Sequence, residues 1–184
     1  MPIVVSTKDC TALSDTELVE MADLCADRPP GFDIGYLSKE REAWVLITQS
    51  REGNKLRGYS FCTLERIGGT PSLLVGLALI DRNSRSEAAL KSIMTDQYRR
   101  ALLAFPDEDV LVGARLLSAD GYRSFVLKGD GGVAGGLDFF APKVKIPDGV
   151  DGHFNGGFDA DKGDRLVAFG WAMAEDLAAG KLGR

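Results

Sequence analysis

The strongest hydrophobic pattern in the chain is the run at positions 72–80, which reads Ser-Leu-Leu-Val-Gly-Leu-Ala-Leu-Ile. Nearly continuous apolar residues over this length predict a strand that is buried on both faces. A polar turn follows at positions 81–87, and apolar side chains then recur at helical spacing as far as Phe105. The sequence therefore predicts a central strand that passes through a charged turn directly into a long helix.

The turn is a candidate anion site. The first N–H groups of a helix have no partner within the helix, and they attract negative charge. Arg82 and Arg85 lie in the turn just before the helix, and we expect any phosphate groups of a ligand here. A core strand under an amphipathic helix, with two solvated arginines between them, would give the same pattern.

Further strands are predicted on both sides of this unit. Residues 2–6, 43–48 and 56–66 have the β-branched, aromatic or alternating character of strands. Turn residues at 51–55 and at 68–69 join the last two of these strands and the strand at 72–80 into an antiparallel meander. Residues 109–117 predict another strand, parallel to the one at 72–80 because a full helix separates the two.

Helices are predicted near both ends. Ser14-Asp-Thr-Glu17 is a capping box that begins a helix ending before residues 28–31. Residues 32–37 predict an irregular loop or a short second helix, with the charges at 39–42 solvated. A last helix is predicted over residues 165–178. It has more large apolar residues than one stripe needs, which suggests a homodimer contact.

These elements predict one α+β domain, with a mixed, mostly antiparallel sheet, flanking helices and a C-terminal helix extension. Residues 1–128 form the core in this interpretation. Residues 129–184 add a glycine-rich connector, edge strands and the last helix, all packed on the same domain.

Composition narrows the choice of partners. The chain has 22 basic and 27 acidic residues, a net charge of −5, which disfavours nucleic acid and favours a small molecule. No segment approaches the roughly 20 apolar residues that cross a membrane, so we expect a cytoplasmic protein. Three cysteines without CxxC spacing and the single His153 predict neither a disulfide framework nor a metal site. Cys62 lacks a nearby histidine in the sequence, so a small buried hydrophobe is the simpler interpretation.

The order of elements over residues 44–117 resembles the GNAT-type N-acetyltransferase superfamily. In that family, an Arg/Gln-x-x-Gly-x-Gly/Ala loop after the fourth strand holds the pyrophosphate of acetyl-coenzyme A at the start of the long helix. The corresponding loop here reads Arg82-Asn-Ser-Arg-Ser-Glu87. Arg82 matches the first position, whereas Arg85 and Glu87 replace the small residues, and Glu87 places a negative charge beside the expected phosphates.

The resemblance implies an acetyl-coenzyme A-dependent transferase that acts on a small amine in a ternary complex. It implies that the pantetheine arm pairs with the strand backbone at 77–80, with 113–115 across the cleft. The residues assigned to acetyl-coenzyme A on this basis are Leu77, Leu79, Ile80, Arg82, Asn83, Ser84, Arg85 and Ser86. By element position, the resemblance assigns Glu65 as the general base and Tyr122 as the acid that protonates the leaving thiolate.

Two other functions stay open at this point. A catalytically inactive GNAT-like module that binds a small ligand or a protein partner would explain the missing glycines directly. An acetyltransferase-type toxin acting on charged tRNA is disfavoured by the acidic balance, because such a substrate needs a basic surface.

Overall fold

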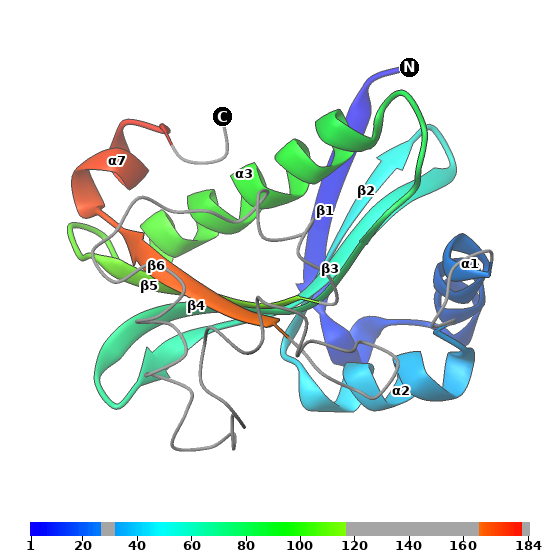
Figure 1. The fold of residues 1–184 in the computed structure, drawn as a ribbon, viewed down its shortest axis with the longest axis horizontal. Coiled ribbons are helices and arrows are strands. Elements are labelled where there is room, and N and C mark those ends of the chain that lie inside the picture. The colour runs from blue at the N-terminus through cyan, green and yellow to red at the C-terminus, as the bar shows by residue number, and fades with distance from the viewer. Residues whose placement is uncertain (27–31, 117–165, 182–184) are drawn as a thin grey trace, which may run out of the picture.

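The computed structural model describes residues 1–26, 32–116 and 166–181 (Figure 1). Its centre is a six-stranded sheet in which the strands lie side by side in chain order. The pairing of β4 with β5 is parallel and the other four pairings are antiparallel. The strands are β1 Ile3–Asp9, β2 Leu46–Glu52, β3 Lys55–Ile67, β4 Thr70–Ile80, β5 Val110–Leu116 and β6 Leu166–Ala172. The predicted mixed sheet, meander and parallel strand are confirmed.

Helices cover the sheet from both sides (Figure 1). The long helix α3 (Ser86–Ala104) packs on one face, and α1 (Asp15–Cys25) and α2 (Ile34–Ala43) pack on the other. A short 3-10 turn, η1 (Cys10–Ala12), precedes α1, and α7 (Ala174–Ala178) follows β6. Each face has its own hydrophobic cluster, so the sheet separates two cores. Among the described helices, none is long and apolar enough to cross a membrane.

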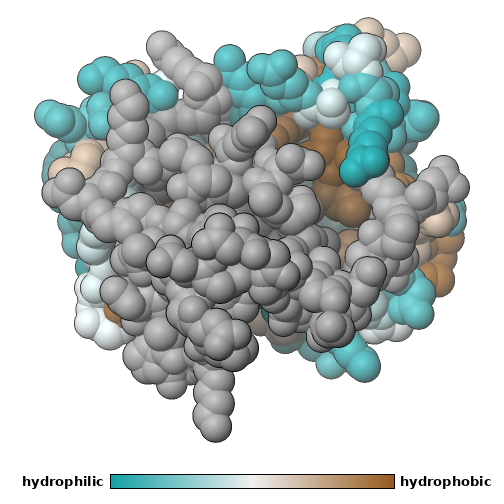
Figure 2. Space-filling view, viewed as in Figure 1, coloured by the Kyte–Doolittle hydropathy of each residue, from teal (hydrophilic) through white to brown (hydrophobic). Residues whose placement is uncertain are grey.

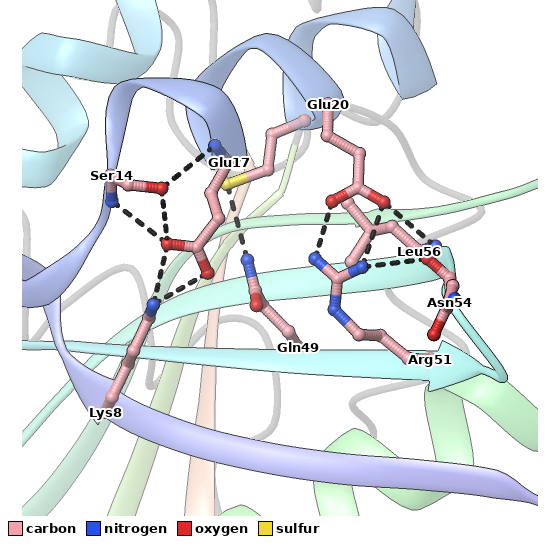
Figure 3. Close-up of polar contacts among 9 residues, drawn as sticks. Lys8, Ser14, Glu17, Glu20, Gln49, Arg51, Asn54 and Leu56 are labelled. Carbon is pink, nitrogen blue, oxygen red and sulfur yellow. Dashed lines mark hydrogen bonds and ion pairs between the residues drawn. The ribbon is translucent and has the colours of Figure 1, made fainter.

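The capping box at the start of α1 is confirmed. The Glu17 N–H donates to Ser14 Oγ at 3.3 Å, and the Glu17 carboxylate accepts from the Ser14 N–H at 3.0 Å (Figure 3). Lys8 of β1 donates to the same carboxylate at 2.6 Å. One turn later, Glu20 accepts from Arg51 of β2 (Figure 3). The helix is thereby fastened to two strands at the edge of the sheet.

The segment after residue 31 forms the regular helix α2. The sequence predicts either an irregular loop or a short helix here. Asp33 caps it by accepting from the Tyr36 N–H at 2.7 Å. Within it, Glu40 is only 9% exposed. The expectation that the charges at 39–42 are all solvated is therefore wrong for Glu40, which faces the sheet and has partners there.

The helix predicted over residues 165–178 is wrong for most of its length. Residues 166–172 form β6, which pairs antiparallel with β5 along its whole length, and only Ala174–Ala178 is helical. The segment alternates large and small residues, Val-Ala-Phe-Gly-Trp-Ala, which is the period of a strand. Backbone pairing with β5 therefore outweighs the helical preference of its alanines. A C-terminal helix is present, but it has only five residues.

The predictions for residues 118–164 lie outside the described residues. They comprise the glycine-rich connector, the edge strands, His153 and Tyr122.

A polar network fixes α3 on the sheet. Asp96 accepts from Thr7 Oγ1 at 2.6 Å and from Arg100 Nε at 2.7 Å, and Thr7 shares a hydrogen bond with Thr48 of β2 at 2.8 Å. Burial alone would raise the pKa of Asp96, but the hydrogen bond from Thr7 and those from two arginines lower it below its ordinary value. The Asp96 carboxylate is therefore ionised in the folded protein at neutral pH.

This network predicts a pH dependence of stability. Because folding lowers the pKa of Asp96, its ionised form stabilises the folded state at neutral pH, and this stabilisation is lost as the pH falls through the folded-state pKa. Urea unfolding should show Asp96→Asn less stable than the wild type at pH 7, with the difference shrinking as the pH falls below the ordinary range of an aspartate pKa. The control is Asp9→Asn, at an exposed carboxylate of β1. A difference for Asp96→Asn that does not change with pH would contradict the assignment.

Candidate functional site

The central strand β4 contains a bulge at Gly76. Ser60 of β3 lies opposite Ala78 and Cys62 lies opposite Val75, so two residues of β4, Gly76 and Leu77, face the single residue Phe61. The buried side of β4 changes at this point: Leu73 and Val75 belong to the α3 core, whereas Leu77 and Leu79 belong to the α1/α2 core. A bulge bends a strand and increases its twist.

The pairing of β4 with β5 stops at the bulge. The two strands pair from Ser72↔Leu111 to Val75↔Ala114. Beyond this point β4 continues to Ile80 beside β3, and β5 continues to Leu116 beside β6. We call the point where the strands separate the fork. In the described part of the chain, no strand pairs with residues 76–79 on the β5 side.

Three side chains meet at the fork on the α1/α2 face. Trp44 Nε1 donates to Glu40 Oε2 at 2.8 Å, and Arg115 Nη2 donates to the two Glu40 oxygens at 3.1 and 3.2 Å. Arg115 is the first residue of β5 after the last one paired with β4, and Glu40 comes from α2. The arrangement, called the fork cluster below, thus places one buried carboxylate beside one guanidinium where the strands separate.

The Trp44 ring lies directly against the backbone of the bulge. A Cβ atom built on Gly76 would lie 2.2 Å from Cε2 and Cζ2 of Trp44. No larger residue fits there without moving the ring. Because Trp44 also donates to Glu40, the absence of a side chain at Gly76 helps to position the carboxylate.

The predicted anion loop lies at the far end of β4. Helix α3 begins at Ser86, and the described residues provide no hydrogen-bond partner for the backbone N–H groups of Glu87 and Ala88, both of which are exposed. Asn83 shapes the loop, since its Oδ1 accepts from the Arg85 N–H at 2.7 Å and its carbonyl accepts from Ser86 Oγ at 2.9 Å. Two N–H groups in the first turn of α3 therefore have no hydrogen-bond partner among the described residues.

Acidic residues hold one of the two loop arginines. Arg85 forms an ion pair with Glu52 at 3.3 Å, and Glu52 and Asp81 also hold Arg57 at 2.6 and 2.9 Å. Arg82 is exposed, and no described residue forms an ion pair with it. The structure thus separates the roles of the arginines: Arg85 braces the loop against β2, and Arg82 is available to a ligand.

The side chains of Leu77 and Leu79 are buried in the α1/α2 core, with exposed fractions of 2% and 8%. Only their backbone is positioned to meet a ligand at the fork. Figure 2 shows a hydrophobic area beside the grey atoms, toward the right of the view.

Two other predicted residues lie elsewhere. Glu65 is exposed and lies opposite Ser72, at the end of β4 that pairs with β5. It stays a prediction, but the fork is several residues away, and the β3 residues facing the separated part of β4 are 58–61. Tyr122 is outside the described residues and also stays a prediction. Cys62 is buried, and desolvation raises the pKa of its thiol to about 11, which favours the small-hydrophobe interpretation.

Sequence reasoning missed Glu40. It lies in the charged run Lys-Glu-Arg-Glu, which is typical of a solvated helix face. The one available signal was its spacing of four residues from Trp44, which places the two side chains on one face of a helix.

The contact between Gly76 and Trp44 generates a prediction. Gly76→Ala should destabilise the protein by about 1–3 kcal/mol, because the new methyl group must displace the ring. In a Trp44→Leu background the same substitution should cost clearly less, since the atoms that clash are gone. Urea unfolding of the four proteins measures this coupling. Equal costs in both backgrounds would show that the ring does not restrict the position.

Comparisons with known proteins were made at the level of sequence and of structure. No family model and no curated protein matches the sequence. Solved structures do match. A ribosomal-protein-alanine N-acetyltransferase from Brucella melitensis biovar Abortus 2308 superimposes with a TM-score of 0.51 at 16% identity, over 70% of this chain and 94% of that one.

Two aminoglycoside acetyltransferases also match. An aminoglycoside 6'-N-acetyltransferase from Enterococcus faecium has a TM-score of 0.48 at 9% identity, over 63% of each chain. An aminoglycoside acetyltransferase from an uncultured soil metagenomic sample has a TM-score of 0.47 at 14% identity, over 80% of this chain and 91% of that one. At these identities a likeness is one of fold, and it is carried by the match to the Brucella enzyme together with the order of the strands and the parallel β4–β5 pair. The chain has the fold of the GNAT-type N-acetyltransferases.

Proposed function

We propose that the protein is an N-acyltransferase that moves an acetyl group from acetyl-coenzyme A to the amine of a small molecule. The observation that carries the proposal is the fork. It separates β4 from β5 on the strand that leads directly to the open first turn of α3. An extended ligand with a charged end fits such a site. Along the chain from the fork cluster, the separated backbone of β4 comes first and the unpaired amides at the start of α3 follow.

The residues present fit acetyl-coenzyme A in three parts. The amides of Glu87 and Ala88 and the side chain of Arg82 would hold the diphosphate. The backbone of 76–79, which pairs with β3 on one side and with no described strand on the other, would pair with the amides of the pantetheine arm. The thioester would then lie near the fork cluster. The Glu87 side chain opposes the diphosphate, so Arg82 carries more of the binding than it would in a glycine loop.

The chemistry needs positioning and proton transfer. A C–N bond forms as the amine attacks the thioester carbon, the C–S bond breaks, and the amine loses its proton. Of the described carboxylates, Glu40 is the one held at the fork, so it is better placed than Glu65 to accept that proton. Tyr122 remains the proposed acid for the thiolate.

The assignment of the diphosphate predicts opposite effects of two loop substitutions. Acetyl-coenzyme A at 100 times its Kd should stabilise the wild type by about 2.7 kcal/mol, seen as a rise in Tm. Arg82→Ala should weaken binding about 10-fold or more, because a charge-assisted hydrogen bond is lost. Glu87→Gln should strengthen binding, because a negative charge beside the phosphates is removed.

Arg99→Ala is the matched control, since Arg99 is an exposed arginine of α3 that lies far from the start of that helix. An unchanged Tm shift in Arg82→Ala would place the phosphates elsewhere. The absence of any shift at millimolar acetyl-coenzyme A would favour the alternative, an inactive GNAT-like module that binds another ligand or a protein.

A homodimer and a cytoplasmic location are also proposals. Trp171 and Met173, which are 37% and 40% exposed where β6 meets α7, form the surface that a second copy would cover.

A further inference from the structure

The ion pair of the fork cluster has a buried partner and an exposed partner. The Glu40 side chain is 11% exposed, whereas that of Arg115 is 41% exposed. Trp44, which Gly76 allows to lie close to the sheet, fixes the carboxylate from behind. A molecule that approaches from solvent therefore meets the guanidinium first and the carboxylate beside it.

Both partners have hydrogen-bonding capacity to spare. Among the described residues, Arg115 donates only through Nη2 and only to Glu40, whereas a guanidinium has five N–H donors. Glu40 Oε1 accepts one hydrogen bond and Oε2 accepts two in the same set of residues. The guanidinium can thus bind an anion while its carboxylate partner binds a cation.

The spacing of the two charges limits the kind of molecule that satisfies both. Arg115 Nη2 and Glu40 Oε1 are 3.1 Å apart, so the ligand's anion and cation must also be adjacent. An α-amino acid has its ammonium and carboxylate groups on one carbon. Placed against this pair, it makes an alternating arrangement of four charges in which each charge has two opposite neighbours. A simple amine would satisfy Glu40 alone.

We propose that the acceptor is a free α-amino acid, with its carboxylate bound by Arg115 and its ammonium group by Glu40. The inference rests on the proposed acetyl transfer. Glu40 takes one proton from the ammonium group, and the nitrogen lone pair attacks the thioester carbon. The C–S bond breaks, the second nitrogen proton goes to the leaving sulfur, and the products are an N-acetyl amino acid and the free thiol of coenzyme A.

The test compares acceptors that differ only in the carboxylate. The twenty common L-amino acids and their carboxamides are offered with acetyl-coenzyme A, and release of the free thiol is measured. The wild type should prefer the best amino acid over its carboxamide by about 10- to 100-fold in kcat/KM, the range that one charge-assisted hydrogen bond provides. Arg115→Gln should remove most of this preference, and Arg115→Lys should keep part of it.

Arg66→Gln is the matched control, because Arg66 is also a partly exposed arginine that is paired with a glutamate, Glu108, and lies away from the fork. It should leave the preference unchanged. The Tm shift with acetyl-coenzyme A is measured for every variant, and an intact shift shows that Arg115→Gln is folded. If Arg115 only fastened β5 to α2, its loss would lower the rates for acids and carboxamides equally.

The outcomes separate the two proposals. Equal rates for acids and carboxamides, an unchanged preference in Arg115→Gln, or a Tm shift without reaction of any amino acid would each overturn the amino-acid acceptor and leave the coenzyme site standing. The absence of both a Tm shift and thiol release would instead refute the acetyltransferase on which the inference rests.

Discussion

The site depends on one departure from regular strand geometry, the bulge at Gly76. A regular strand keeps alternate residues on one face, so Leu73, Val75, Leu77 and Leu79 would all pack under α3. The extra residue turns the last two toward α1 and α2 instead. The same turn carries β4 away from β5, since β5 stays paired with β6 in an unbroken register. One additional residue therefore produces both the exchange between cores and the open strand edge.

The charges near the two ends of this edge are arranged differently. At the α3 end, acidic residues already satisfy Arg57 and Arg85, and the pKa values of Glu52 and Asp81 are lowered as a result. These pairs are partly exposed, and such pairs contribute little to stability individually. They order the loop, and Arg82 forms no ion pair with a described residue. At the fork, by contrast, the carboxylate is buried and the arginine is partly exposed. Under the proposals above, the first end binds a strongly charged group, and the second binds a group whose own two charges pair with both members of an existing ion pair.

The parts of the fold that sequence could predict are those with local causes. The capping box, the loops of the meander and the strand–turn–helix unit are each determined by residues that lie close together in the sequence. The faces of β3 were predictable for the same reason. The prediction of a helix over residues 166–172 is wrong because their apolar content is compatible with a helix. They form a strand because they pair with β5, which is about fifty residues away in the chain. Glu40 was missed because its burial depends on Arg115, which is 75 residues distant in the chain.

The prediction of a buried strand at 72–80 is correct, but it does not include the bulge at Gly76. Continuous apolar character over 72–80 predicts a strand buried on both faces. The strand is buried on both faces, and the bulge changes which core its large side chains contact: Leu73 and Val75 lie in the α3 core, whereas Leu77 and Leu79 lie in the α1/α2 core. An isolated glycine within a strand is itself a signal for a bulge or a close backbone approach, and here it is both, since the Trp44 ring occupies the space a side chain would take. The glycine that opens the sheet is therefore also the residue that lets Trp44 hold Glu40 at the opening.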